Sequence, residues 1–201
     1  METIKKHWFK LALFALVAIF GSIYLIDRYG GGGTGMPDLG KAPAFSLEDT
    51  EGKTVGLSDE DGKVRLVYFY FASCPDVCLT TTNLLAEVQA GLKKDGLFGD
   101  ETHMFSITFD PKRDTKERLI QFSGAYGADY SGWSFLRGDE AATAKLAESY
   151  GITVVKDENN NFIHSNRIML IDKNGTIRQS YNGDEVKAEQ IVKDMSKLSK
   201  A

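Results

Sequence analysis

Cys74 and Cys78 are the only cysteines in this chain of 201 residues. They directly follow the apolar run 64–71, which is typical of a buried strand. A strand that continues through a turn into a helix would put both sulfurs at the helix N-terminus, where the dipole and the N–H groups favour thiolate over thiol. Two residues four apart lie about 40° apart on one helical face. The pair can therefore form a disulfide or bind one soft metal ion.

Several functions fit such a pair taken alone. A plain structural disulfide would close a small loop and constrain the unfolded chain little. A zinc site would need two further strong ligands. The histidines are His7 near the N-terminus, His103 at the head of a predicted strand, and His164 in a polar loop just before a strand. A loop histidine is usually exposed or locally hydrogen-bonded, so residue type alone does not make His164 a ligand.

Residues 1–28 are typical of a membrane anchor. Three lysines precede an uncharged stretch, 11–26, which would rise about 24 Å as a helix. A bilayer core is about 30 Å thick, so flanking residues must complete the span. The Ala-x-Ala sequence at 42–44 is far beyond the apolar run, which favours an uncleaved anchor over a signal peptide.

The charges around this segment predict its orientation. Lys5, Lys6 and Lys10 precede the helix, whereas Arg28 alone follows it, which places the N-terminus in the cytosol. The remaining chain then lies outside the cytosol, where disulfides persist. Because no Arg- and Ser-rich transit segment precedes the anchor, we expect a single-pass protein of the bacterial inner membrane with a periplasmic or outward-facing domain.

The rest of the chain divides into a tether and one domain. Residues 29–41 are rich in glycine and form a flexible linker, and the globular domain is expected over 42–201. The net charge is −4, and no basic cluster is interleaved with aromatic residues. The sequence therefore gives no support to nucleic-acid binding.

Strand and helix patterns alternate along the domain. We expect strands at 45–47, 53–55, 64–71, 104–109, 134–136, 167–171 and 176–181. Helices are expected over 84–92, after a capping box of Asp114 and Glu117, over 139–150, and after Asp184 as a cap. The segment 172–175 contains Asn-Gly, which predicts a hairpin turn.

This order predicts an α/β, thioredoxin-like fold: a mixed central sheet flanked by helices, an extra N-terminal hairpin and one N-terminal transmembrane helix. A cysteine pair near such a unit usually indicates a redox motif with two intervening residues. Here three residues intervene.

Three segments resemble the signatures of the Sco (SenC) family of copper chaperones for cytochrome c oxidase. The first is Phe-x-x-Cys-Pro-Asp-Val-Cys at 71–78, directly after the strand. The second is Ile-Thr-Phe-Asp-Pro-Lys-Arg-Asp-Thr at 107–115. The third is Ile-His-Ser at 163–165, followed by Met-Leu-Ile-Asp-Lys-Asn-Gly at 169–175. They occur in the family's order behind one N-terminal anchor.

The resemblance implies that Cys74, Cys78 and His164 bind copper, as Cu(I) or Cu(II). It further implies a copper metallochaperone that receives copper from a donor protein and delivers it to the dinuclear site of cytochrome c oxidase subunit II in the respiratory chain. A thiol–disulfide oxidoreductase that reduces the cysteines of that target is the alternative, with Cys74 attacking and Cys78 resolving. A peroxiredoxin-like peroxidase is disfavoured because the sequence lacks a Pro-x-x-x-Thr/Ser-x-x-Cys pattern.

Two positions depart from the family pattern. Ser73 stands where a histidine is common, which removes an accessory ligand or proton donor, and Leu79 replaces a frequent proline. Neither change removes one of the three expected ligands. Asp110 and Arg113 either hold their loop near the site or form a salt bridge before the helix, and the second role is favoured. Core packing is expected for Met104, Met169 and Trp133.

Overall fold

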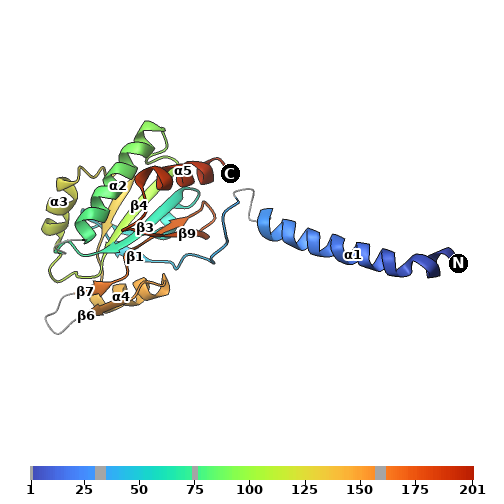
Figure 1. Ribbon diagram of the computed structural model, residues 1–201. Helices are drawn as coiled ribbons and strands as arrows, with labels where there is room; N and C mark the ends of the chain where they lie inside the picture. Colours follow the sequence, from blue (N-terminus) through green and yellow to red (C-terminus); the bar gives the residue numbers. More distant parts are fainter. Residues whose placement is uncertain (1, 30–34, 74–76, 157–161) are drawn as a thin grey trace. The chain divides into compact units, whose positions relative to one another are not determined.

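The computed structural model describes residues 2–29, 35–73, 77–156 and 162–201. The chain divides into two compact units. The first ends at Pro37, and the second comprises Asp38–Lys200 (Figure 1). The first unit contains helix α1 (Glu2–Tyr29). Among the described residues, no helix has both the length and the apolarity needed to cross a membrane. The anchoring role of residues 1–28 therefore stays a prediction.

A five-stranded mixed sheet forms the centre of the second unit, in the order β5-β4-β3-β8-β9. Strands β3, β4 and β5 are parallel, whereas β8 pairs antiparallel with both β3 and β9. The strands are β3 (Val64–Tyr70), β4 (Thr102–Thr108), β5 (Trp133–Leu136), β8 (Arg167–Ile171) and β9 (Ile177–Asn182). Every residue of β3 and β4 is buried, as expected for central strands covered on both faces. The predicted order of strands and helices around a mixed sheet is confirmed.

The helices of this unit are α2 (Val77–Lys94), α3 (Lys116–Ala125), α4 (Glu140–Ser149) and α5 (Ala188–Ser199). Helices α2 and α5 lie side by side (Figure 1). A Cβ atom at Gly91 of α2 would lie 2.7 Å from Cγ2 of Val192 in α5, so glycine permits this close approach. Asp139 caps α4 as predicted, because its carboxylate accepts the Ala142 N–H at 2.9 Å.

The predicted N-terminal hairpin is present as β1 (Ser46–Glu48) and β2 (Thr54–Gly56), with Gly52 at φ 85° in its turn. A short 3-10 helix, η1 (Leu57–Glu60), leads from this hairpin toward β3. A buried arginine of the central sheet contacts η1.

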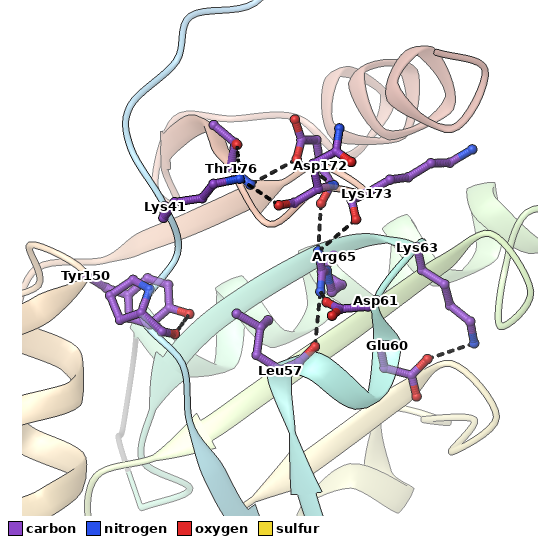
Figure 2. A network of polar contacts seen from close by, with 12 residues as sticks. Lys41, Leu57, Glu60, Asp61, Lys63, Arg65, Tyr150, Asp172, Lys173 and Thr176 are labelled. Carbon is purple, nitrogen blue, oxygen red and sulfur yellow. Dashed lines mark hydrogen bonds and ion pairs between the residues drawn. The ribbon is translucent and has the colours of Figure 1, made fainter. Parts of the chain in front are cut away.

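Arg65 of β3 is fully buried and links three segments (Figure 2). Its guanidinium donates to the carbonyl oxygens of Leu57 at 3.1 Å and Asp172 at 2.8 Å, and it pairs with the Asp61 carboxylate at 2.6 Å. The charge is thus compensated, as burial requires. Arg65 therefore holds η1 and the β8–β9 turn at the N-terminal end of the central strand β3.

A second small sheet was not predicted. Strands β6 (Val154–Lys156) and β7 (Phe162–His164) pair antiparallel, with Val154 opposite His164. The expectation that His164 lies in a loop is therefore wrong, because it ends a strand. Each strand has only three residues, which is too short for an alternation pattern to be recognised.

The predicted start of α3 is wrong by one residue. Thr115 is the N-cap, and its hydroxyl accepts the Arg118 N–H at 3.3 Å. Asp114 is instead fully buried and accepts the Ala72 N–H at 2.8 Å and the Thr108 hydroxyl proton. The carboxylate is thus used in the interior, and the neighbouring threonine caps the helix.

The predicted cap of the last helix is also wrong. Helix α5 begins after Lys187, whose side chain makes no capping hydrogen bond. Asp184 lies before this start, and its carboxylate accepts a hydrogen bond from the Asn166 side-chain amide at 2.8 Å. The sequence correctly placed Asp184 shortly before a helix. In the fold, however, its carboxylate binds the side chain of Asn166 and does not cap that helix.

Candidate metal centre

Cys78 is the second residue of α2 and is completely buried. It lies close after β3, so the predicted strand–turn–helix arrangement does bring it to a helix N-terminus. The dipole and the first N–H groups at this position stabilise negative charge on the sulfur, whereas its complete burial opposes that charge. Cys74, the other predicted ligand, lies outside the described residues.

His164 contacts Cys78 across 86 residues of sequence. Its Nε2 atom lies 3.5 Å from the Cys78 sulfur, and its Nδ1 atom lies 3.3 Å from the backbone carbonyl oxygen of Ser165. A carbonyl oxygen only accepts hydrogen bonds, so the ring proton belongs on Nδ1. Nε2 then directs its lone pair toward the sulfur. A backbone carbonyl that orients a ligating histidine in this way is a common feature of metal sites.

The imidazole is enclosed by aromatic side chains. Its ring centroid lies 5.0 Å from that of Phe109 and 6.0 Å from that of Phe71. Phe162 extends this cluster, at 5.6 Å from Phe71 and 5.0 Å from Phe109. Burial among these groups lowers the pKa of His164, although the hydrogen bond to Ser165 and the charge of Asp184 oppose the shift. The ring is therefore neutral at physiological pH, as a metal ligand must be.

The distance between the two donors fits a metal ion. A sulfur bond of about 2.3 Å and a nitrogen bond of about 2.0–2.1 Å place the two atoms about 3.5 Å apart at a tetrahedral angle and about 3.8 Å apart at a trigonal angle. The observed 3.5 Å agrees with such coordination. Thiolate and imidazole together suit Cu(I) and zinc. Within the described part of the chain, no three His, Cys, Asp or Glu side chains gather as a metal-binding group.

Arg113 and Asp110 lie beside this cluster. The guanidinium carbon of Arg113 is 5.7 Å from the Phe71 ring centroid and 5.9 Å from that of Phe162. Arg113 also pairs with the buried Asp110 carboxylate. The favoured salt bridge is thus observed, and the same arginine packs over the aromatic rings that surround His164.

The other residues considered from the sequence have different surroundings. His103 is buried on β4 beside Ser134, and His7 belongs to α1 in the other unit. Met104 and Met169 are buried core residues, as expected. Ser73 and Leu79, which flank the cysteine motif, are both exposed.

Phe162 is the site residue that sequence reasoning missed. It precedes His164 by two positions, so strand alternation places both rings on the same side of β7. That signal was present in Phe162-Ile163-His164, but it has meaning only once the segment is recognised as a strand.

A family model, SCO1/SenC, matches residues 36–200 of this chain. The SCO1 protein homolog of Bacillus subtilis (strain 168) is 27% identical over 159 residues, which cover 77% of this chain and 81% of that protein. The family model therefore matches the whole of the second unit.

Solved structures show the same fold. A SCO1/SenC family lipoprotein from Bacillus anthracis has a TM-score of 0.73 at 30% identity, covering 79% of this chain and 95% of that one. Bradyrhizobium japonicum ScoI with copper bound has a TM-score of 0.67 at 28% identity, and the match covers 79% of this chain and 99% of that one. BsSco has a TM-score of 0.71 at 26% identity, and the match covers 81% of this chain and 95% of that one. BsSco is described as a member of the Sco family of cytochrome c oxidase assembly proteins with a disulfide switch.

Proposed function

This chain belongs to the SCO1/SenC family, and on that premise we propose that it is a membrane-tethered copper metallochaperone. Its cargo is copper, and its target is the dinuclear copper site of cytochrome c oxidase subunit II. Two relatives support this proposal: B. japonicum ScoI holds copper, and BsSco is a cytochrome c oxidase assembly protein. A donor protein would supply the ion.

The approach of Cys78 Sγ to His164 Nε2 at 3.5 Å is the observation that carries the proposal. The two residues come from separate elements, α2 and β7, and only the tertiary fold brings them together. With Cys74 as the third ligand, the donor set would be two thiolates and one imidazole. Such soft donors select Cu(I) over hard cations.

The residues of the site have distinct tasks in binding and release. Cys78, at the helix N-terminus, supplies a thiolate, and His164 supplies a neutral nitrogen whose direction the Ser165 carbonyl fixes. The rings of Phe71 and Phe109 pack against the half-buried imidazole and limit the freedom of its ring. Oxidation of Cys74 and Cys78 to a disulfide would remove two ligands at once, so copper loading and thiol redox state are coupled.

The tether is the second part of the proposal. The uncharged stretch 11–26 and the preceding lysines favour an N-terminal helix in the bacterial inner membrane, with the domain in the periplasm or otherwise outside the cytosol. The glycine-rich residues 30–35 would allow the domain to reach a partner in the same membrane.

Copper titration of His164→Ala tests the ligand assignment. We expect the reduced wild-type protein to bind one copper ion and His164→Ala to bind at least about 10-fold more weakly, because even outer-shell changes typically cost this much. The Cu(II) absorption spectrum should also change. Affinity is measured by competition with a chromophoric Cu(I) chelator. His103→Gln is the matched control, because it alters a buried histidine on β4 and should leave affinity and spectrum unchanged.

The outcomes separate the two functions. Equal affinity and spectrum in His164→Ala and wild type would refute His164 as a ligand. A wild-type protein that binds no copper but catalytically reduces a disulfide substrate would establish the oxidoreductase function instead, since thiol exchange needs only the cysteines.

A further inference from the structure

The β6–β7 hairpin carries His164 but does not belong to the central sheet. In the described residues its strands pair with each other, as a separate two-stranded sheet. Backbone hydrogen bonds of the main sheet therefore do not fix its position. The short connection from His164 to β8 and side-chain contacts with the rest of the domain determine where the imidazole lies relative to Cys78.

Glu140 makes ion pairs with two segments that border the site. Its Oε1 atom lies 2.8 Å from the Lys156 ammonium of β6, and its Oε2 atom lies 2.8 Å from the Lys112 ammonium in the loop after β4. Glu140 is the first residue of α4, directly after the Asp139 cap. A carboxylate is favoured at this end of a helix, and both lysines lower the pKa of Glu140. It therefore stays charged between them.

Lys156 continues this connection to His164. Lys156 lies directly opposite Phe162 in the hairpin register, and its ammonium is 4.8 Å from the Phe162 ring centroid. Phe162 and His164 are two residues apart on β7, and both rings lie 5.0 Å from Phe109. Displacement of Lys156 would thus disturb the packing that seats the histidine.

We propose that Glu140 is a positioning residue of the copper site. Through Lys156 and Phe162 it holds the β6–β7 hairpin so that His164 Nε2 faces the Cys78 sulfur. It acts through Lys156 and is not itself proposed as a ligand. The copper part of this inference rests on the proposed function, whereas the holding of the hairpin does not.

A substitution of Glu140 should alter the position of the hairpin without lowering the stability of the whole domain. The Glu140 side chain is 26% exposed and that of Lys156 is 34% exposed. Partly solvated pairs of this kind contribute little to global stability. A change at Glu140 that alters the site while leaving the unfolding temperature unchanged would therefore reflect positioning.

Glu140→Gln in the full-length chain tests the proposal. In the metal-free protein, amide hydrogens of β6 and β7 should exchange faster than in wild type, because a two-stranded hairpin held less firmly by the domain is only marginally stable and opens more often. Copper affinity should fall by a factor of about 2 to 30, the range for residues that modulate a site without contacting its ligand. Lys156→Met should have the same effect, and the double variant should be no weaker than either single variant because both act in one connection.

Glu51→Gln is the matched control. Glu51 pairs with Lys53 at 2.6 Å in the β1–β2 hairpin, so the substitution removes the same charge from an ion pair of another element. It should change neither hairpin exchange nor copper affinity.

Two results would overturn the proposal: wild-type exchange of the hairpin in Glu140→Gln, or faster exchange with the copper affinity of the control. If wild type binds no copper, the proposed function fails on its own. The exchange measurement then still decides whether Glu140 holds the hairpin.

Discussion

His103 is buried and His164 is half-buried, and their ring nitrogens face different groups. His164 directs Nε2 to the Cys78 sulfur and Nδ1 to a backbone carbonyl. His103 places Nε2 2.9 Å from the Ser134 hydroxyl, and its Nδ1 is 3.5 Å from the Glu60 carboxylate. Burial lowers the pKa of His103 to about 4, although the negative charge of Glu60 opposes the shift. His103 is thus a neutral core residue, and only His164 is set beside a thiol.

The lowered pKa of His103 predicts a pH dependence of stability. The unfolded chain takes up the proton near the ordinary pKa of 6.5, whereas the folded protein does so only at about 4. Stability is therefore complete above about pH 6.5 and falls as the pH drops from there to about 4, by up to about 3 kcal/mol. His103→Gln cannot take up this proton. Its unfolding free energy, measured by urea denaturation from pH 7.5 to 4.5, should decrease less steeply than that of wild type.

The comparison of the two proteins isolates His103, because all other groups titrate in both. Parallel decreases in wild type and His103→Gln would show that this histidine does not cause the acid sensitivity.

At the scale of elements, Thr115 caps helix α3, whereas the neighbouring Asp114 accepts hydrogen bonds in the interior. Thr115→Ala should lower the unfolding free energy by about 1 kcal/mol, the usual cost of a lost N-cap. Asp114→Ala should cost about 2–3 kcal/mol, because the buried Ala72 N–H and Thr108 hydroxyl would lose their acceptor. Urea unfolding of both variants measures the difference.

A negligible loss of stability in Thr115→Ala would favour the capping box expected from sequence. In that case Asp114→Ala would cost about 1 kcal/mol and Thr115→Ala almost nothing. The segment after β3 that leads to the cysteine motif depends on this interaction, because Ala72 lies only two residues before Cys74.

At the scale of the whole molecule, copper should stabilise the fold. An ion that binds only the folded protein adds about 2.7 kcal/mol at a free concentration of 100 times Kd. For a domain of this size that raises the unfolding midpoint by roughly 5–10 °C. Calorimetry of the reduced protein with Cu(I) should show this rise, and a Cu(I) chelator should reverse it.

His164→Ala provides the control, because it has one ligand fewer and should show a smaller rise at the same copper concentration. An equal rise in both proteins would mean that copper stabilises the fold from another site.

The sequence by itself determined the order of the main elements and the family, and it predicted the chemistry of the ligands. Apolar runs, the Asn-Gly turn before Thr176 and the Asp139 cap are local patterns, so strands β3, β4 and β8 and helix α4 could be predicted from neighbouring residues. The cysteine spacing and the three signatures are equally local. Residue types and short distances along the chain are sufficient for such inferences.

Only the tertiary structure decided which of these residues meet. The Cys78–His164 contact, the buried role of Asp114 and the pairing of Asp184 with Asn166 all join residues far apart in the chain or redirect a side chain from a local partner. The β6–β7 hairpin has strands too short to give a pattern, yet packing of Phe162 against Phe71 and Phe109 favours it. Burial and long-range packing select among local alternatives of similar energy, and no single segment of sequence contains that information.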